Sequence, residues 1–156
     1  MSHLVAKKSK GKTDMVIFEG ADGTGKSYLS KQKMDKMGAG LLLHFDKPVK
    51  GFDKYIYFHV ALLKVPVVLD RFYMSELVYS DVYGRQCLLD YMDVNCLEEL
   101  MTKREADVRV LIVKNKQLIE KRLKSRGEEV CGHCLDRINE GYKELGECYG
   151  YELIEI

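Results

Sequence analysis

The segment from Gly20 to Ser27 reads GADGTGKS and matches the pattern G-x-x-x-x-G-K-[ST] in full. An apolar run precedes it and a segment with helical spacing, 28–37, follows it, which is the order of strand, loop and helix that this pattern requires. The glycines of such a loop let the backbone fold tightly, so that successive N–H groups point at phosphate oxygens. A glycine-rich turn that binds nothing is the alternative, but spacing and context both favour a phosphate-binding loop.

The side chains of this loop suit a nucleoside triphosphate with Mg²⁺. Lys26 is expected to reach the β and γ phosphates, and Ser27 offers its hydroxyl to a Mg²⁺ ion that bridges them. The residues expected to bind the nucleotide are Gly20, Asp22, Gly23, Thr24, Gly25, Lys26, Ser27 and Tyr28.

Five short runs rich in Val, Ile and Leu predict buried parallel strands. Segments with helical spacing lie between them, so we expect an α/β protein: a five-stranded parallel sheet with helices on both faces, in the three-layer arrangement of P-loop NTPases. The strands are expected at 15–20, 41–46, 65–70, 108–114 and 151–156. The helices are expected at 28–37, 73–83, 88–101, 117–126 and 135–145.

The composition is that of one ordinary domain. The 156 residues are 46% hydrophobic, which predicts a single globular unit over 14–156, and the polar, lysine-rich segment 1–13 is expected to be disordered. A formal net charge of +1 gives no field that would attract nucleic acid or a membrane. The apolar runs fall far short of the ~20 residues that span a bilayer, and we see no secretory leader, so a cytoplasmic protein is expected.

The five cysteines are scattered and odd in number, which favours reduced thiols over a disulfide framework. Two of them form the tetrapeptide Cys131-Gly132-His133-Cys134. Zinc normally takes four ligands, and no second CxxC follows this one. A redox dithiol would need a thioredoxin-type context that is missing here. Neither a zinc site nor a redox dithiol is therefore favoured for this tetrapeptide.

A second polar signal follows the apolar run VPVVL, where Asp70 and Arg71 stand at the expected carboxyl end of a strand. Ligands of open α/β sheets collect at this edge. Asp70 can hold Mg²⁺ through water or accept the proton of an attacking oxygen, and Arg71 can bind phosphate oxygens. A surface ion pair is the alternative. No guanine-reading N-K-x-D tetrapeptide occurs and the chain is too short for a motor ATPase, so a small kinase is the class that fits.

FEGADGTGKS and DRFYMSELVYS together resemble the thymidylate kinase branch of the P-loop nucleotide kinases, whose pattern runs F-E-G-x-D-G-x-G-K-[ST] and then D-R-[YF]-x-x-S-x-x-A-Y-Q. The segment 108–129 is similar to that family's fourth strand and the helix that leads into a basic lid, here about 122–137. The resemblance implies ATP as phosphoryl donor with Mg²⁺. It also implies that a lid arginine, Arg122 or Arg126 with Arg137 as a further candidate, stabilises the transition state.

The same resemblance assigns the acceptor site. It implies that Asp22 contacts the acceptor sugar or its phosphate, that Arg71 holds that phosphate, and that Phe72 lies beside the sugar. Tyr79 falls in register with the family's tyrosine. Ser80 replaces the glutamine that reads thymine, so it can still bond a base edge while thymine specificity is doubtful.

The acceptor is therefore expected to be a deoxynucleoside monophosphate of the dTMP kind, with two alternatives open. Asp46, before Pro48, is similar to the acidic general base of deoxynucleoside kinases and would serve a nucleoside acceptor; a simple turn residue is equally compatible. The segment between the second and third strands is much shorter than in full-length relatives, so a non-catalytic nucleotide-binding protein is the other alternative. Base preference and a homodimer are left open.

Three further features are less specific. An aromatic cluster in the short middle segment is expected to be mostly core, with one ring able to stack on a base. Phe45 is a similar candidate. Glu19 is expected either to orient the phosphate loop or to be an ordinary strand residue. The aromatic cluster consists of Phe52, Tyr55, Tyr57 and Phe58.

Overall fold

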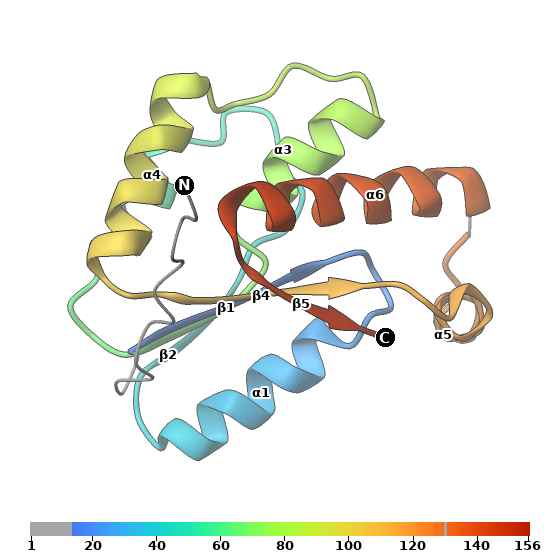
Figure 1. The fold of residues 1–156 in the computed structure, drawn as a ribbon, viewed down its shortest axis with the longest axis horizontal. Helices are drawn as coiled ribbons and strands as arrows, with labels where there is room; N and C mark the ends of the chain where they lie inside the picture. Colours follow the sequence, from blue (N-terminus) through green and yellow to red (C-terminus); the bar gives the residue numbers. More distant parts are fainter. Residues whose placement is uncertain (1–13, 130) are drawn as a thin grey trace, which may run out of the picture.

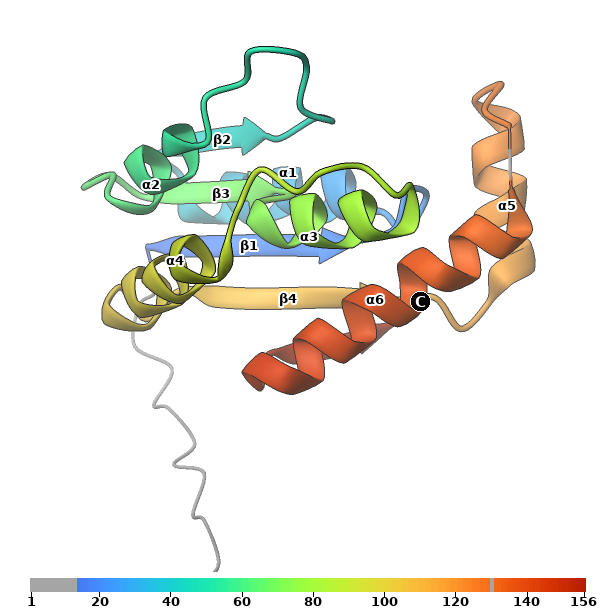
Figure 2. The same ribbon diagram turned by 90° about the horizontal axis from the view of Figure 1, so that it is seen from above.

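The computed structural model describes residues 14–129 and 131–156, so the lysine-rich segment 1–13, which was expected to be disordered, lies outside the described residues. Five strands form one parallel sheet in the order β2-β3-β1-β4-β5 (Figure 2). This confirms the α/β class and the five-stranded parallel sheet. The strands are β1 (Met15–Gly20), β2 (Leu41–His44), β3 (Val67–Asp70), β4 (Asp107–Ile112) and β5 (Glu152–Glu155).

Helices cover both faces of this sheet, as expected. Helix α1 lies on one face, whereas α3, α4 and α6 lie on the other, and α5 stands beyond the carboxyl ends of the strands (Figures 1 and 2). The helices are α1 (Lys26–Met37), α2 (Tyr55–Ala61), α3 (Tyr73–Val82), α4 (Tyr91–Lys103), α5 (Lys116–Ser125) and α6 (Gly132–Tyr149).

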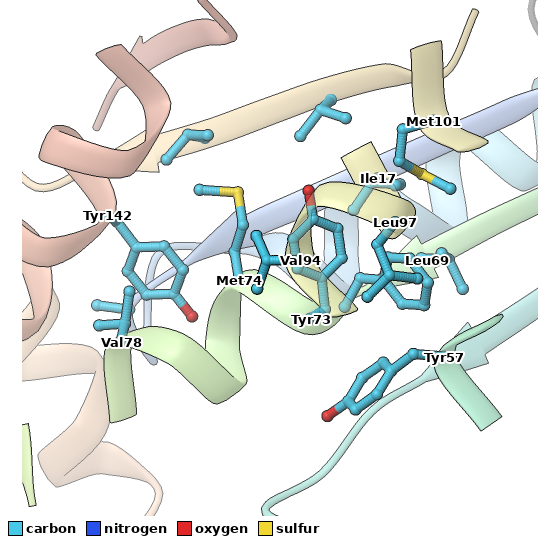
Figure 3. Packing of buried hydrophobic residues seen from close by; sticks show 14 of the residues in the cluster. Ile17, Tyr57, Leu69, Tyr73, Met74, Val78, Val94, Leu97, Met101 and Tyr142 are labelled. Carbon is cyan, nitrogen blue, oxygen red and sulfur yellow. The ribbon is translucent and has the colours of Figure 1, made fainter. Parts of the chain in front are cut away.

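Successive side chains of a strand point to opposite faces of the sheet, and helices cover both faces. The central strands are therefore buried on both sides. Ile17 and Leu69 face the larger core, where they pack with side chains of α3 and α4 such as Met74 and Leu97 (Figure 3). Val16, Phe18 and Val68 face the smaller core under α1, which Leu29, Met34 and Met37 complete. Every residue of β1 is buried, as expected for the central strand of the sheet.

Element boundaries differ from the expected ones for local reasons. Strand β3 begins at Val67 rather than at 65, because Pro66 has no N–H to donate to a ladder. Helix α4 begins at Tyr91, since Asp90 and Asp93 form a capping box there. Helix α6 is longer than expected at both ends and stops where Gly150 adopts a left-handed conformation.

One helix was not expected. Helix α2 has only seven residues and occupies the aromatic segment YIYFHVA, where no clear apolar period of a helix is present. Its buried residues, Tyr57, Val60 and Ala61, pack it onto the larger core, so tertiary contacts rather than the local pattern account for it.

None of the helices within 14–129 and 131–156 has the length and apolarity needed to cross a bilayer.

Candidate active site

The phosphate loop follows β1 and leads into α1, and two of its glycines are required by close contacts. Gly20 has φ 143°, and a Cβ there would lie 2.7 Å from the carbonyl oxygen of Leu111. Gly23 has φ 81°, and a Cβ there would lie 3.0 Å from Cγ2 of Ile119 on α5. The loop is therefore held between β4 and α5. Gly25 precedes α1 without a side chain to cap it, so the first N–H groups of this helix are free to bind an anion.

A cavity of about 910 Å³ surrounds the loop, which is ample for a nucleotide. Lys26 lines it, and its Nζ donates a hydrogen bond of 2.7 Å to the carbonyl oxygen of Ala21. Burial lowers the pKa of Lys26 to about 8, although the carboxylates of Asp70 and Glu19 act in the opposite direction. The residues along the cavity include Asp22, Gly23, Thr24, Gly25, Lys26, Ser27, Tyr28, His44, Asp46, Asp70, Arg71, Arg122 and Arg126.

Oxygen ligands suitable for Mg²⁺ meet at the ends of β1 and β3. Ser27 Oγ donates a hydrogen bond of 2.5 Å to Asp70 Oδ2. The other carboxylate oxygen of Asp70, Oδ1, is buried and has no hydrogen-bond partner among the described residues. A hydroxyl and a carboxylate are the ligand types that Mg²⁺ prefers, so the two residues predicted from the sequence to bind the metal fit that ion.

His44, at the end of β2, contacts both Asp70 and Asp46 through its ring nitrogens. Its Nδ1 lies 2.9 Å from Asp70 Oδ2, and its Nε2 lies 2.8 Å from Asp46 Oδ1. The imidazole thus joins the carboxylate beside the phosphate loop to the exposed carboxylate of Asp46. Sequence analysis overlooked His44, because a histidine at the end of an apolar run carries no pattern that points to a site.

The turn after β3 holds Arg71 in an uncommon conformation. Arg71 has φ 66°, a left-handed value that costs free energy for a residue with a Cβ and that clusters at functional sites. Its N–H donates to the carbonyl of Phe18 at 2.9 Å. Its guanidinium forms an ion pair with Asp22 and lies 5.2 Å from the centroid of the Tyr79 ring. Its Nε is buried and has no hydrogen-bond partner among the described residues.

Glu19 supports this turn from β1. Its carboxylate accepts hydrogen bonds from the Phe72 N–H at 2.8 Å and from Ser75 Oγ at 2.7 Å, and Ser75 Oγ lies 2.7 Å from the Tyr142 hydroxyl. Burial raises the pKa of Glu19 to about 7, although these hydrogen bonds act against the shift. The carboxylate therefore contacts the turn that carries Arg71, and neither the phosphate-loop role nor the ordinary strand position expected as alternatives describes these contacts.

The arginines expected in a lid come to the phosphate loop. Arg122 on α5 donates from Nη1 to the carbonyl of Gly23 at 3.0 Å, and Arg126, which follows α5, lines the same cavity with its Nε 3.3 Å from Glu128 Oε1. Arg137, a third basic residue of the expected lid, instead donates to the carbonyl of Val82 at 3.2 Å. Of these three arginines, Arg122 and Arg126 line the cavity and Arg137 does not.

A second cavity, of about 220 Å³, opens beside the first. Asp22, Asp46 and Arg71 line both cavities, so the two sites meet at these three side chains. Aromatic rings form much of the second cavity. The residues along it are Asp22, Phe45, Asp46, Lys47, Pro48, Tyr57, Arg71, Phe72, Ser75, Glu76, Tyr79, Tyr83 and Arg85.

Most of the acceptor residues expected from the sequence line this second cavity, including Phe72 and Tyr79. Ser80 does not, because it is buried on α3 and its hydroxyl donates to the carbonyl of Leu77 at 3.1 Å. From the aromatic cluster of the middle segment, Tyr57 supplies a wall and stacks on Phe45 at 5.1 Å between ring centroids.

Sequence analysis overlooked the ion pair in this cavity between the buried Glu76 and the partly exposed Arg85. One signal was available. Glu76 lies between Tyr73 and Ser80 on the buried side of α3, and a carboxylate on such a face requires a partner of opposite charge.

The cysteines make no comparable site. All five are free thiols, and Cys131 Sγ accepts a hydrogen bond of 3.3 Å from the N–H of Cys134 at the start of α6. Over the described ranges, no three side chains of His, Cys, Asp or Glu gather in the way that would hold a metal ion.

Comparison with known proteins adds evidence for the fold. No family model and no curated protein matches the sequence. Among solved structures, the YorR protein of Bacillus subtilis, in complex with phosphorylated GDP, is similar with a TM-score of 0.75 and 24% identity over 91% of this chain and 84% of that one.

Two further structures are named as kinases. A gluconokinase from Sinorhizobium meliloti 1021 has a TM-score of 0.54 at 15% identity, covering 91% of this chain and 82% of that one. The deoxyadenosine kinase of M. mycoides with bound dCTP has a TM-score of 0.51 at 20% identity, covering 91% and 89%. At these identities the likeness concerns the fold, and the chain has the three-layer, parallel-sheet fold of P-loop kinases.

Proposed function

We propose that the protein is a phosphotransferase that moves the γ-phosphoryl group of ATP to a deoxynucleoside monophosphate. The observation that carries this proposal is the junction of the two cavities at Asp22, Asp46 and Arg71. A triphosphate on the phosphate loop and an acceptor in the smaller cavity would meet there, which is the arrangement that in-line transfer requires. The nucleotides named with YorR and with the deoxyadenosine kinase support a nucleotide as the ligand.

On the donor side, the loop N–H groups and Lys26 would bind the β and γ phosphates. Ser27 and Asp70 would hold Mg²⁺, which offsets the negative charge on the transferred group. Arg122 and Arg126 line the same cavity, and a guanidinium directed at the γ phosphate would stabilise the charge that spreads over its oxygens.

On the acceptor side, Arg71 favours a monophosphate over a nucleoside. Its guanidinium stands at the junction of the two cavities, and a positive charge held there suits an acceptor that already carries a phosphate. Asp22 forms the ion pair that orients this guanidinium. A monophosphate needs no strong base, because the attacking oxygen is already charged.

The test is a coupled assay of ADP formation with ATP, Mg²⁺ and a panel of deoxynucleosides and their monophosphates. We expect turnover on monophosphates, and a loss of at least about a hundredfold in Lys26→Ala because a cation at the developing charge is removed. Lys31→Ala, an exposed lysine of the same helix, is the matched control and should keep its activity. ATP binding without product from any acceptor would instead favour a non-catalytic nucleotide-binding protein.

A deoxynucleoside is the second candidate acceptor, because the carboxylate of Asp46 lies at the junction and is 2.8 Å from His44. Such a carboxylate is placed to accept the proton of a sugar hydroxyl. An Asp46→Asn variant separates the two candidates: activity on monophosphates should largely remain, whereas activity on nucleosides, if that is the reaction, should be lost.

A further inference from the structure

The smaller cavity is built for a flat ring. Phe45, Tyr57 and Phe72 contact one another with ring centroids 5.1 to 5.6 Å apart, and Tyr79 stacks on Tyr83 at 6.1 Å. All five line the cavity. Aromatic faces bind a planar base without selecting among bases, because every base has a π surface. Selectivity must therefore come from polar groups.

Three charged residues line the smaller cavity without lining the larger one, namely Lys47, Glu76 and Arg85, and the last two form an ion pair. The residues that both cavities share mark the end of the smaller cavity nearest the phosphate loop. Glu76 and Arg85 line only the part of the smaller cavity that the larger one does not share, and the base of an acceptor would be in that part if its phosphate lay at Arg71.

Glu76 is fully engaged by the protein. Its side chain has no exposed surface, and its two oxygens accept hydrogen bonds of 2.7 Å from Nη1 and Nη2 of Arg85. Oε1 also accepts the N–H of Leu88 at 2.9 Å. This carboxylate binds the guanidinium in the two-pronged geometry that fixes an arginine most strongly.

Arg85 is the member of the pair that a ligand can reach. Its side chain is 26% exposed, and its guanidinium carries five N–H donors and no acceptor. Glu76 occupies two of them, and a third contact, to the carbonyl of Gln86, is long at 3.5 Å. The ion pair therefore presents the cavity with fixed hydrogen-bond donors and leaves no accessible acceptor on Glu76.

We propose that Arg85, held by Glu76, selects acceptors whose base carries a carbonyl oxygen, that is, 6-oxopurine and 4-oxopyrimidine monophosphates. The inference rests on the proposed function and names its substrate class. A guanidinium pairs well with a carbonyl oxygen of a base, and in guanine with O6 and N7 together. An amino group at the same ring position is itself a hydrogen-bond donor, so it would face the donors of the guanidinium and form no hydrogen bond with them.

The experiment uses two pairs of monophosphates, dIMP with dAMP and dUMP with dCMP, whose members differ in this group and in the hydrogen on the ring nitrogen beside it. We would measure kcat/KM for transfer from ATP, and Kd by calorimetry, which does not require turnover. The oxo member of each pair should be favoured at least about tenfold, as expected for one well-placed arginine contact to a base. Equal values, or a preference for the amino member, would overturn the inference.

The variant must not leave a buried charge alone, because a carboxylate without its partner would destabilise the protein. We therefore change both residues, Glu76→Gln with Arg85→Gln, so that two amides can still pair. The oxo-to-amino ratio should fall to within about threefold, the residual spread of neutral contacts. The matched control is Asp107→Asn with Arg109→Gln, another pair at 2.7 Å that lines neither cavity, and it should keep the ratio of the unchanged protein.

The outcomes separate this inference from the proposed function. Selective binding of oxo monophosphates without transfer would refute the kinase while supporting the role of Arg85. Transfer to all four acceptors at similar rates would support the kinase and refute the role of Arg85. If none of the four bound, both proposals would fall.

Discussion

Glu19 is a carboxylic acid enclosed in the protein, and its protonation links pH to folding. The group has a pKa of about 7 in the folded protein, raised by burial, against an ordinary value of 4.5. Between these values the folded chain binds a proton that the unfolded chain has released. The resulting contribution to stability is fully present below about pH 4.5 and is lost as the pH rises through about 7.

A Glu19→Gln variant should remove this dependence while it keeps an acceptor for the Phe72 N–H. We expect the free energy of unfolding of the unchanged protein to fall, relative to the variant, by about 3 kcal/mol between pH 4.5 and pH 8. Urea titrations over this range would measure it, with the exposed Glu99→Gln as a control. Parallel pH profiles for unchanged protein and Glu19→Gln would show that Glu19 titrates normally.

Residues of the site were predictable where a motif fixes backbone geometry as well as side chains. Lys26, Ser27 and Asp70 lie together as expected, because the loop and the end of β3 leave them few alternatives. Arg85 was not predictable, since the role proposed for it depends on a contact with Glu76 across a turn, and no spacing rule describes that contact. Ser80 was expected near the base by register alone, but its hydroxyl bonds within α3.

At the level of elements, the phosphate loop and α5 are fitted to each other at Gly23. A Cβ on this residue would lie 3.0 Å from Ile119 and 3.3 Å from Leu123. Gly127 is a natural control, because its φ of 73° is similar to that of Gly23 but a Cβ there meets no described atom within 4 Å.

Both glycines should lose stability when changed to alanine, but by different amounts. Gly127→Ala should cost about 1 kcal/mol through its left-handed backbone alone. Gly23→Ala should cost about 1 kcal/mol more, because the added methyl group presses on α5. Urea denaturation of both variants provides the comparison. Equal losses in the free energy of unfolding would mean that α5 accommodates the methyl group of Gly23→Ala without destabilising the protein.

The elements that sequence analysis placed correctly have strong local signals, such as the apolar run of β1 and the helical period of α5. Helix α2 was overlooked because its seven residues are too few for a period to emerge. The start of α4 was placed too early, since the apolar residues Leu88 and Leu89 continue the pattern while Asp90 caps the helix after them.

For the molecule as a whole, Arg104 joins parts of the chain that are far apart in sequence. Its guanidinium contacts Asp14 at 3.1 Å, the carbonyl of Ala61 at 3.2 Å and the carbonyl of Val65 at 2.7 Å. One side chain at the end of α4 thus holds the start of β1, the end of α2 and the segment before β3.

Arg104→Met should therefore destabilise the protein by about 2 to 4 kcal/mol, because several charge-assisted hydrogen bonds are lost at once. Lys103→Met removes an exposed positive charge one position earlier and should change stability by less than about 0.5 kcal/mol. Thermal and urea unfolding would compare the two. A loss in Arg104→Met no larger than in the control would show that these contacts add nothing to the fold.

The central position of β1 also governs the order in which this protein can acquire activity during synthesis. Met15 pairs with Val67 on β3, and Val16 pairs with Asp107 on β4, so the strand that precedes the phosphate loop cannot form its sheet pairs until residues much later in the chain have been synthesised. Such non-local pairing makes folding slow relative to helical proteins. A nascent chain released from the ribosome before Ile112 would contain the whole nucleotide-binding motif and still lack the neighbour that holds it in shape.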